Sequence, residues 1–516
     1  MKRLHCLWIF VLLCAECAVS QTLCGGRPVS LRKAMPNLVD VQQLPSRQQL
    51  AKADFFESTK NPDVFAVPVS TNFNPCNSGQ WEHVEGRNVW RLAICSHNAF
   101  SLNATFADFY IPQDAEMYIY NSDATQVVGA FTSENNADVL PTIPVVGDML
   151  VVEYSEPDSA DFQGFFNIVQ VAHDFKGVFA DSSSSQCQIA VDSDMVTEWK
   201  NEKRSVCKII VGGTTLCTGT LLSTADKSFE PYVLTARHCI YSEKLAQSSI
   251  FYFNYDDENA EKQYVSGASL VAVKDNDDGF LDFSLVKLSK SVPVDYNAYY
   301  AGWDASGETP EGVVCIHHPN GDAKKIAIDD DSLKVASYRN FDELTFWNVE
   351  EWDEGATEQG SSGAPVFNSD HRVVGILAGG DSDCSYPMND YFQMFSVCYN
   401  RYQLESMQLE RWLNPQGADI LKLDGTYNLD NSVMTSAEIA ELHISPNPAS
   451  SQILVSASKL IENVDVVSAF GQLVVSHNVH SQQSATIDIA NLRQGLYVCR
   501  VLFADKTSTN TVIIKK

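Results

Sequence analysis

A histidine, an aspartate and a serine, far apart in the chain, are the residues most suited to chemistry. Peptide hydrolysis by a serine requires a base for the hydroxyl proton, a carboxylate that orients the base, and backbone donors for the oxyanion. His238 directly precedes Cys239 at the end of an apolar segment, and Ser362 lies in the small-residue turn Gly360–Pro365. Asp282 leads an apolar strand, where an acid is unexpected unless it is buried and paired. The order His, Asp, Ser is a known triad order, so these three are the predicted catalytic triad.

Two neighbouring serines compete for the role of nucleophile. We choose Ser362 over Ser361 because, in a Gly-x-Ser-Gly turn, the residue directly before the second glycine is the attacker. The turn would direct the N–H groups of Gly360 and Ser362 to one point, which predicts an oxyanion hole formed by these two amides. A glycine–serine turn alone is usually only a turn, and the histidine element in the same segment is what favours chemistry.

These residues must be positioned by strands, because short apolar segments separated by turn residues recur along the chain and predict an all-β fold. Its 516 residues are enough for two to four domains. We expect a signal peptide over 1–20, a β-rich pro-region over 21–180, a double β-barrel serine peptidase domain over 187–425 and a C-terminal β-sandwich over 441–516. The strands expected around the site are Thr218–Leu222, Tyr232–Thr235, Ile250–Phe253, Phe283–Leu288, Val313–Ile316 and Val373–Ala378, with a helix over Gln403–Leu413 stopped by Pro415.

The N-terminus predicts export. A basic start at Met1–Arg3 precedes the apolar run Leu7–Leu13 and the small residues Ala18–Ser20, as in a signal peptide. No stretch is long enough for a transmembrane helix, so we expect no stable membrane insertion. A net charge of −29 argues against nucleic acid as a partner. The polar run Asp181–Ser185 is typical of an exposed linker, and Lys176–Gly177 before it is a suitable place for proteolytic separation.

The cysteines predict disulfides rather than a metal site. The 14 cysteines lack paired CxxC spacing, and an exported chain with this pattern forms disulfides. His317 and His318 are adjacent, so their side chains diverge, and no third ligand follows. The acidic clusters at 256–258 and 329–331 lack the alternating spacing of a calcium loop and are interpreted as solvated surface. We predict no metal and no cofactor.

Ile210–Gly213 is similar to the activation terminus of trypsin, but only three residues separate it from Cys217. That tether is too short for insertion into the enzyme, which predicts an ordinary strand instead.

Residues from about 187 to 425 resemble the trypsin-like superfamily, in particular the bacterial lysyl endopeptidases. The matching sequences are Cys217-Thr-Gly-Thr-Leu, Leu234-Thr-Ala-Arg-His-Cys239, Phe253-Asn-Tyr255, Asp282-Phe-Ser-Leu, Ala301-Gly-Trp303, Ile316-His-His-Pro319, Gly360-Ser-Ser-Gly-Ala-Pro365, Gly379-Gly380 and Trp412-Leu-Asn-Pro415. The resemblance implies a chymotrypsin-like double β-barrel, a Cys217–Cys239 bridge and a Cys187–Cys384 bridge.

The same resemblance places the residues that select the substrate. The position six before the nucleophile is the uncharged Ala356, and the resemblance implies that the S1 acid is instead Asp390, after the glycine pair Gly379-Gly380. Ala378 and Gln393 depart from the family pattern, which leaves arginine or a mixed basic preference open. Lys176 and Arg204 are then candidates for self-cleavage.

The last part of the chain resembles the C-terminal sorting domains of the type IX secretion pathway. The matching sequences are Ser445-Pro-Asn-Pro-Ala449, Ala469-Phe-Gly-Gln-Leu473 and Leu492-Arg-Gln-Gly-Leu-Tyr497. This implies passage through the outer-membrane secretion machinery, with an accessory β-sandwich as the alternative. Trp81–Arg91 and Leu140–Gly147 resemble the pro-regions of such secreted proteases.

We therefore predict a serine endopeptidase, secreted or at the cell surface, that cleaves protein or peptide substrates after Lys, with Arg left open, through an acyl-enzyme. Two alternatives remain: a catalytically idle adhesin that keeps the fold, and a narrowly specific protease whose pro-region stays attached and binds substrate.

Overall fold

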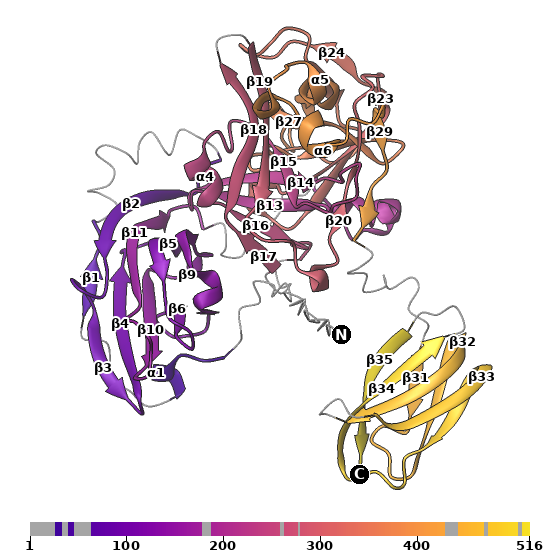
Figure 1. Cartoon of the computed structure of the whole chain (residues 1–516). Helices are drawn as coiled ribbons and strands as arrows, with labels where there is room; N and C mark the ends of the chain where they lie inside the picture. Colours follow the sequence, from indigo (N-terminus) through magenta and orange to yellow (C-terminus); the bar gives the residue numbers. More distant parts are fainter. Residues whose placement is uncertain are drawn as a thin grey trace, which may run out of the picture. The chain divides into compact units, whose positions relative to one another are not determined.

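The computed structural model describes residues 26–32, 40–45, 63–177, 187–257, 263–276, 279–428, 442–468, 473–503 and 508–516. The chain divides into two compact units, Met1–Asn431 and Ser432–Lys516, and both are built mainly of strands (Figure 1). The predicted all-β class is confirmed. The predicted signal peptide and the serine linker at 181–185 lie outside the described residues. Within the described part of the chain, no helix combines the length and apolarity that a bilayer crossing needs.

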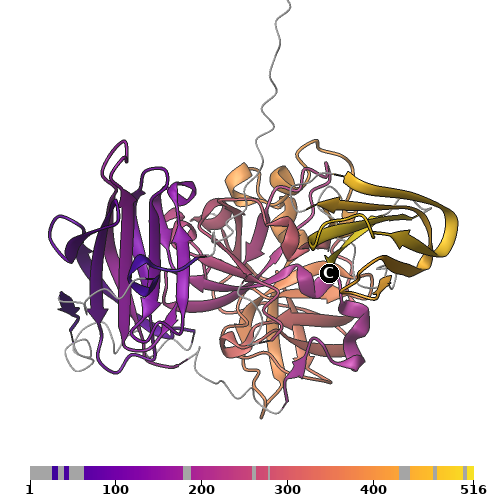
Figure 2. The same cartoon turned by 90° about the horizontal axis from the view of Figure 1, so that it is seen from below.

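The part of the chain between residues 26 and 177, which lies in the predicted pro-region, consists of two sheets that pack face to face (Figure 2). One has the strand order β1-β4-β10-β6-β7 with β3 on β4, and the other has β2-β11-β5-β8 with β9 on β5. The core between the sheets is rich in aromatic residues. The rings of Trp90, Phe106 and Tyr154 each pack edge to face against the fully buried Phe166. The elements are α1 (Val29–Arg32), β1 (Val41–Gln43), β2 (Ala66–Phe73), β3 (Gln80–Val84), β4 (Arg87–Cys95), β5 (Ser101–Tyr110), β6 (Glu116–Asn121), β7 (Val127–Phe131), η1 (Ser133–Asn135), β8 (Ala137–Pro141), β9 (Val145–Val146), β10 (Met149–Pro157) and β11 (Phe165–Asp174).

The first sheet within residues 187–428 has the order β17-β16-β13-β14-β15-β19-β18 and carries the histidine and the aspartate. Its elements are β13 (Val206–Val211), β14 (Thr215–Leu221), β15 (Tyr232–Thr235), α4 (Glu243–Gln247), β16 (Ile250–Phe253), β17 (Gln263–Ser266), β18 (Ala268–Asn276) and β19 (Gly279–Leu288). Ile210 and Val211 pair with β14 as the end of β13, which confirms the ordinary strand predicted there.

The second sheet has the order β12-β23-β22-β26-β27-β28-β25-β24, with β21 between β27 and β29, and carries the serine and the proposed S1 acid. Two such curled sheets form the chymotrypsin-like double barrel. The elements of this half are β12 (Ile189–Ala190), η2 (Asp194–Trp199), η3 (Glu202–Arg204), η4 (Val294–Tyr296), β20 (Tyr299–Tyr300), β21 (Gly302–Asp304), β22 (Glu311–His317), η5 (Pro319–Gly321), β23 (Lys325–Ser332), β24 (Lys334–Ala336), β25 (Phe346–Glu351), β26 (Pro365–Asn368), β27 (Arg372–Gly380), β28 (Met388–Met394), α5 (Phe395–Asn400), η6 (Glu405–Met407), α6 (Glu410–Leu413), β29 (Lys422–Leu423) and β30 (Thr426–Tyr427), which pairs with β20.

The six strands expected around the site are confirmed, but the long helix over 403–413 is wrong. Only η6 and the single turn of α6 form there, and the main helix of this region is α5, earlier in the chain. Gln408 donates a side-chain hydrogen bond to the Gln403 carbonyl, so the chain closes a loop where a helix was expected. Leu409 and Leu413 are fully buried. The helical spacing of these two leucines therefore comes from one helical turn that packs into the core.

The interpretation of the acidic clusters as solvated surface is wrong for two residues. Asp256 accepts ion pairs from Lys203 and Lys324, both at 2.9 Å, and the Lys324 side chain is completely buried. Burial raises the pKa of Asp256, but the charges of Lys324 and Lys203 outweigh it and hold that pKa well below its usual range. Asp329 is buried, whereas Asp330 and Asp331 are exposed. A buried lysine that needs a counter-charge explains the first case.

Two disulfides fix the loops around the site. Cys217 of β14 is bridged to Cys239, directly after His238, with Cα atoms 6.3 Å apart. Cys187 is bridged to Cys384 across 197 residues, with Cα atoms 5.5 Å apart. Both pairings are those that the resemblance implies.

The C-terminal unit is a bent sheet with the order β31-β32-β34-β35 and β33 on β32. The first half of β32 pairs with β31 and the second half with β34, with register shifts between Ser456 and Ile461. The strands are β31 (Leu442–Ser445), β32 (Gln452–Ser468), β33 (Leu473–Asp488), β34 (Gly495–Phe503) and β35 (Ser508–Lys515). Most of the motif Ala469–Leu473 lies outside the described residues.

Candidate active site

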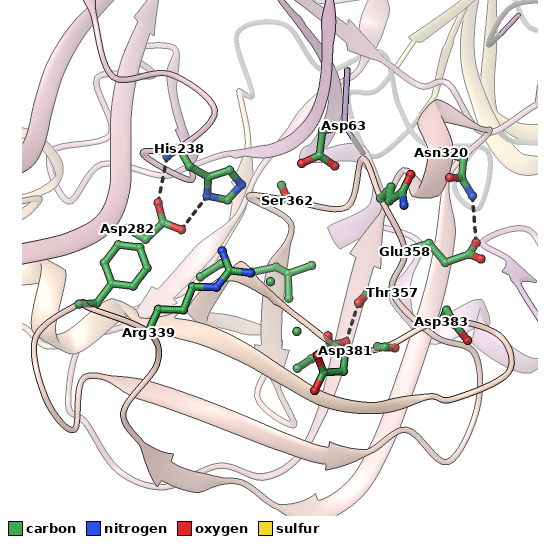
Figure 3. Close-up of a pocket in the computed structure, with 18 residues that line it drawn as sticks. Asp63, His238, Asp282, Asn320, Arg339, Thr357, Glu358, Ser362, Asp381 and Asp383 are labelled. Atoms are coloured by element: carbon green, nitrogen blue, oxygen red, sulfur yellow. Dashed lines mark hydrogen bonds and ion pairs between the residues drawn. The ribbon is translucent and has the colours of Figure 1, made fainter. Parts of the chain in front are cut away.

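A cleft of about 780 Å³ contains the side chains of His238, Asp282 and Ser362 (Figure 3). The first two come from the first sheet and the serine from the turn before β26 of the second. The cleft also reaches Gly379, Gly380 and Asp390, which were predicted to bind the substrate. Residues from both halves of the protease domain therefore share one cavity.

His238 and Asp282 form a paired base and carboxylate. Asp282 lies in β19 with 1% of its surface exposed, and its Oδ2 is 2.7 Å from Nδ1 of His238. Its other oxygen, Oδ1, accepts the backbone N–H of His238 at 3.0 Å. Two contacts to one carboxylate orient the ring so that Nε2 is left for proton transfer.

The pKa of His238 results from opposing effects. Burial lowers this pKa. The charge and hydrogen bond of Asp282, together with the charge of Asp63, raise it by more, so the net change is upward from 6.5. Arg339, which also lines the cleft, lowers the pKa of His238 through its positive charge. A histidine whose pKa is raised by a paired carboxylate is suited to accept a proton as a general base.

Gln393 holds the backbone of Asp282 in place through a hydrogen bond. It is fully buried, its Oε1 accepts the backbone N–H of Asp282 at 2.9 Å, and its Nε2 donates to the Thr345 carbonyl at 2.8 Å. In the sequence this residue stood out only as a departure in the pocket segment. The structure turns its side chain away from the pocket and toward the strand that carries Asp282.

The two candidate serines differ in their surroundings. Ser361 is completely buried, with its Oγ 2.7 Å from Nδ1 of His317 and accepting the N–H of Glu358 at 3.2 Å. Ser362 is half-buried and lines the cleft. Only Ser362 is therefore placed to meet a substrate.

The adjacent histidines have separate structural partners. His317 holds Ser361, and Nδ1 of His318 donates to the Asp322 carbonyl at 2.9 Å. Burial lowers the pKa of His317 to about 3 and that of His318 well below its usual value, so both rings are neutral. Among the described residues, no group of three or more metal-ligating side chains is arranged to hold an ion.

The turn that carries Ser362 needs its glycines. Gly360 has φ +84°, and a Cβ there would lie 3.0–3.2 Å from backbone atoms of residues 318–321. Gly363 has φ +83°, and a Cβ there would lie 2.4 Å from the Thr218 carbonyl. The positive φ and the tight packing together require glycine. The Gly360 N–H, predicted as an oxyanion donor, is occupied here by Oδ1 of Asp63 at 2.8 Å.

Asp390 forms a buried acidic wall of the cleft. It lies in β28 with 1% exposure, and its Oδ2 accepts Nε1–H of Trp352 at 2.7 Å and the Thr357 hydroxyl at 2.6 Å. Burial raises the pKa of Asp390 to about 6, against the lowering effect of these hydrogen bonds. Gly380 pairs with Asp390 across the strands, and a Cβ on it would lie 2.3 Å from Asp390 Oδ1. Ala356 is buried beside Thr357 and carries no charge.

Several residues that contact the site residues were missed from the sequence. Trp352, Thr357 and Gln393 contact the predicted acids, and Asp63 comes from the part of the chain predicted to be a pro-region. Thr357 had a weak signal, since it follows Ala356 in the turn that leads to the serine. Gln393 stood out only as a departure from the family pattern, and Trp352 and Asp63 had no signal, because the contacts of all three depend on strand register or on packing between distant parts of the chain.

A chymotrypsin-like double barrel with a histidine–aspartate pair and an accessible serine at the junction of its halves defines the class: the chain is a serine endopeptidase. The "Lysyl endopeptidase, C-terminal domain" family model matches residues 181–393. A curated lysyl endopeptidase from Pseudomonas aeruginosa is 26% identical over 358 residues, which cover 61% of this chain and 75% of the relative. In this segment the chain resembles the bacterial lysyl endopeptidases.

Two solved structures that match the chain align with a smaller part of it. A Glu endopeptidase is 17% identical, with 41% of this chain and 92% of that chain covered and a TM-score of 0.28. The inactive form of Rv3671c from M. tuberculosis is 16% identical, with 41% and 89% covered and a TM-score of 0.28.

A second family model, the "Secretion system C-terminal sorting domain", matches residues 443–515. This match covers nearly the whole C-terminal unit. The chain is secreted or displayed at the cell surface.

Proposed function

We propose that this endopeptidase cleaves after Lys or Arg by acyl transfer, with Ser362 as nucleophile, His238 as general base and acid, and Asp282 as the group that orients the ring. Ser362 attacks the scissile carbonyl while His238 accepts its proton. The imidazolium then protonates the leaving amine, and water hydrolyses the acyl-enzyme by the same steps in reverse order. The 2.7 Å contact between His238 and Asp282 supports these roles.

The oxyanion would be bound by the N–H groups of Gly360 and Ser362. The tightly packed glycine turn supports this assignment, because it fixes both amides before substrate arrives. No cofactor takes part in this chemistry.

The basic preference rests on one observation, the buried carboxylate of Asp390 in the cleft shared with the triad. A buried acid is costly unless a cation reaches it, and the Lys or Arg side chain of a substrate would supply that cation. Trp352 and Thr357 both bind the same oxygen, Oδ2, and hold the carboxylate in place. The name of the P. aeruginosa relative favours Lys, whereas Ala378 and Gln393 depart from the family pattern.

The precursor would be processed at both ends. We infer a signal peptide over 1–20, a pro-region over 21–180, a protease domain over 187–425 and a sorting domain over 441–516 that engages the outer-membrane secretion machinery. The sorting-domain match supports the last of these.

Labelling with a fluorescent fluorophosphonate tests the assignment of the nucleophile. The processed enzyme and its Ser361→Ala variant should both be labelled, because Ser361 is buried, and Ser362→Ala should not. Labelling that disappears in Ser361→Ala and persists in Ser362→Ala would overturn the assignment.

A further inference from the structure

A segment of the pro-region lies in extended form along the edge of β14, the strand that leads into the active site. The N–H of Leu216 donates to the Asp63 carbonyl at 2.9 Å, and the N–H of Phe65 donates to the Thr214 carbonyl at 2.9 Å. Val64 and Thr215 form an antiparallel bridge between them. Strand addition of this kind holds a peptide through its backbone and directs its side chains to defined places.

The side chain at the start of this segment reaches the proposed oxyanion hole. Oδ1 of Asp63 accepts the Gly360 N–H at 2.8 Å. An oxyanion donor should lie 2.7–3.1 Å from the position of the negatively charged oxygen, so the carboxylate oxygen stands where that oxygen would form. Asp63 lines the same cleft as Ser362 and His238 (Figure 3).

The pro-region holds this segment firmly in place. Phe65 is fully buried in a core cluster that includes Leu216 and Tyr252 of the protease domain. Asn103 and Gln170 donate side-chain hydrogen bonds to the carbonyls of the turn at 212–213, each at 2.9 Å. These contacts fix the β13–β14 turn and the segment at 63–66 as one assembly, so Asp63 faces Gly360 at a high effective concentration.

Resting on the proposed function, we propose that the oxyanion hole of this enzyme is also a binding site for an acidic extended peptide, and that Asp63 of its own pro-region is the inhibitory ligand. The carboxylate supplies a negative oxygen but no scissile peptide bond, so it occupies the Gly360 donor without being cleaved. None of the contacts depends on a covalent link between the pro-region and the protease domain. A single cut after Lys176 therefore leaves the enzyme blocked until the pro-region dissociates or is degraded.

Fluorophosphonate labelling of the uncleaved chain tests this proposal. The phosphoryl oxygen of the probe must enter the oxyanion hole, so Asp63 should slow its reaction. The probe is added briefly to freshly purified precursor, and a denaturing gel separates the full-length band from the processed band. We expect the full-length Asp63→Ala chain to be labelled about 10²-fold faster than the full-length wild type, the order of magnitude associated with one oxyanion donor.

The matched control is Asp158→Ala, which removes an exposed acid of the same pro-region that pairs with His83 at 3.4 Å. Its full-length band should be labelled as slowly as the wild type. Equal, slow labelling of the full-length Asp63→Ala and wild-type chains, with rapid labelling of both processed bands, would refute the proposal. The rapid processed band also shows that the protease domain of the variant is folded. If the processed wild type is not labelled either, the proposed function fails instead.

Discussion

Replacing Asp390 by Asn should change the specificity of the enzyme while leaving its catalytic groups in place. The substitution keeps the shape of a side chain that is 1% exposed but removes the charge that would face a Lys or Arg at P1. Removing one partner of a buried charge pair costs about 2–5 kcal/mol. A central value of about 3 kcal/mol corresponds to a loss of about 10²-fold in kcat/KM. The assay compares peptides with Lys, Arg and norleucine at P1, at pH 8, where a carboxyl group with a pKa of about 6 is ionised.

The norleucine peptide and the variant Asp381→Asn are the controls. Asp381 is an exposed acid of the same cleft, so its removal should change kcat/KM for the Lys peptide by only a few-fold. In Asp390→Asn the norleucine peptide should be cleaved as well as, or better than, by the wild type. A parallel loss for Lys and norleucine, or no loss for Lys, would refute the reasoning that Asp390 reads the charge of the P1 residue.

Three further predictions follow from the cleft. For a Lys peptide, kcat/KM should fall with decreasing pH through two groups that must both be unprotonated: Asp390, whose pKa is raised to about 6, and His238, whose pKa is raised above 6.5. A norleucine peptide should report His238 alone, so equal limiting slopes of log kcat/KM against pH for the two peptides would contradict this. Gln393→Leu should lower kcat by about 10- to 100-fold with little change in KM, because the backbone N–H of Asp282 loses its hydrogen-bond acceptor. The acidic limb of the pH profile should also move to lower pH. A change in KM alone would argue against a positioning role for Gln393. Gly380→Ala should raise KM for Lys and Arg peptides, because the added methyl group would meet Asp390 Oδ1; unchanged Michaelis constants for both peptides would show that the strand can shift.

The catalytic residues predicted from the sequence each carry a local signature. His238 precedes a cysteine at the end of an apolar strand, Ser362 sits between glycines, and Asp282 is an acid at the head of an apolar strand. Local patterns also predicted the strands around the site, since the alternation of apolar residues depends only on neighbouring positions.

Other features depend on distant parts of the chain. Side chains alternate along β28, so Gln393, three residues after Asp390, faces the opposite side of the sheet and reaches Asp282. Trp352 meets Asp390 because β25 and β28 pair with Val349 opposite Asp390. Asp63 is 297 residues from Gly360, and no motif connects them. Asp256 was misread as a solvated residue because its lysine partners come from other parts of the chain.

The most direct test is the cleavage profile of the processed protein on a peptide library, with Ser362→Ala as the control. The account predicts cuts in which Lys or Arg is strongly enriched at P1, and no cuts by the variant. Cuts without enrichment for a basic residue would contradict the role of Asp390, and an unchanged profile in Ser362→Ala would contradict the catalytic mechanism itself.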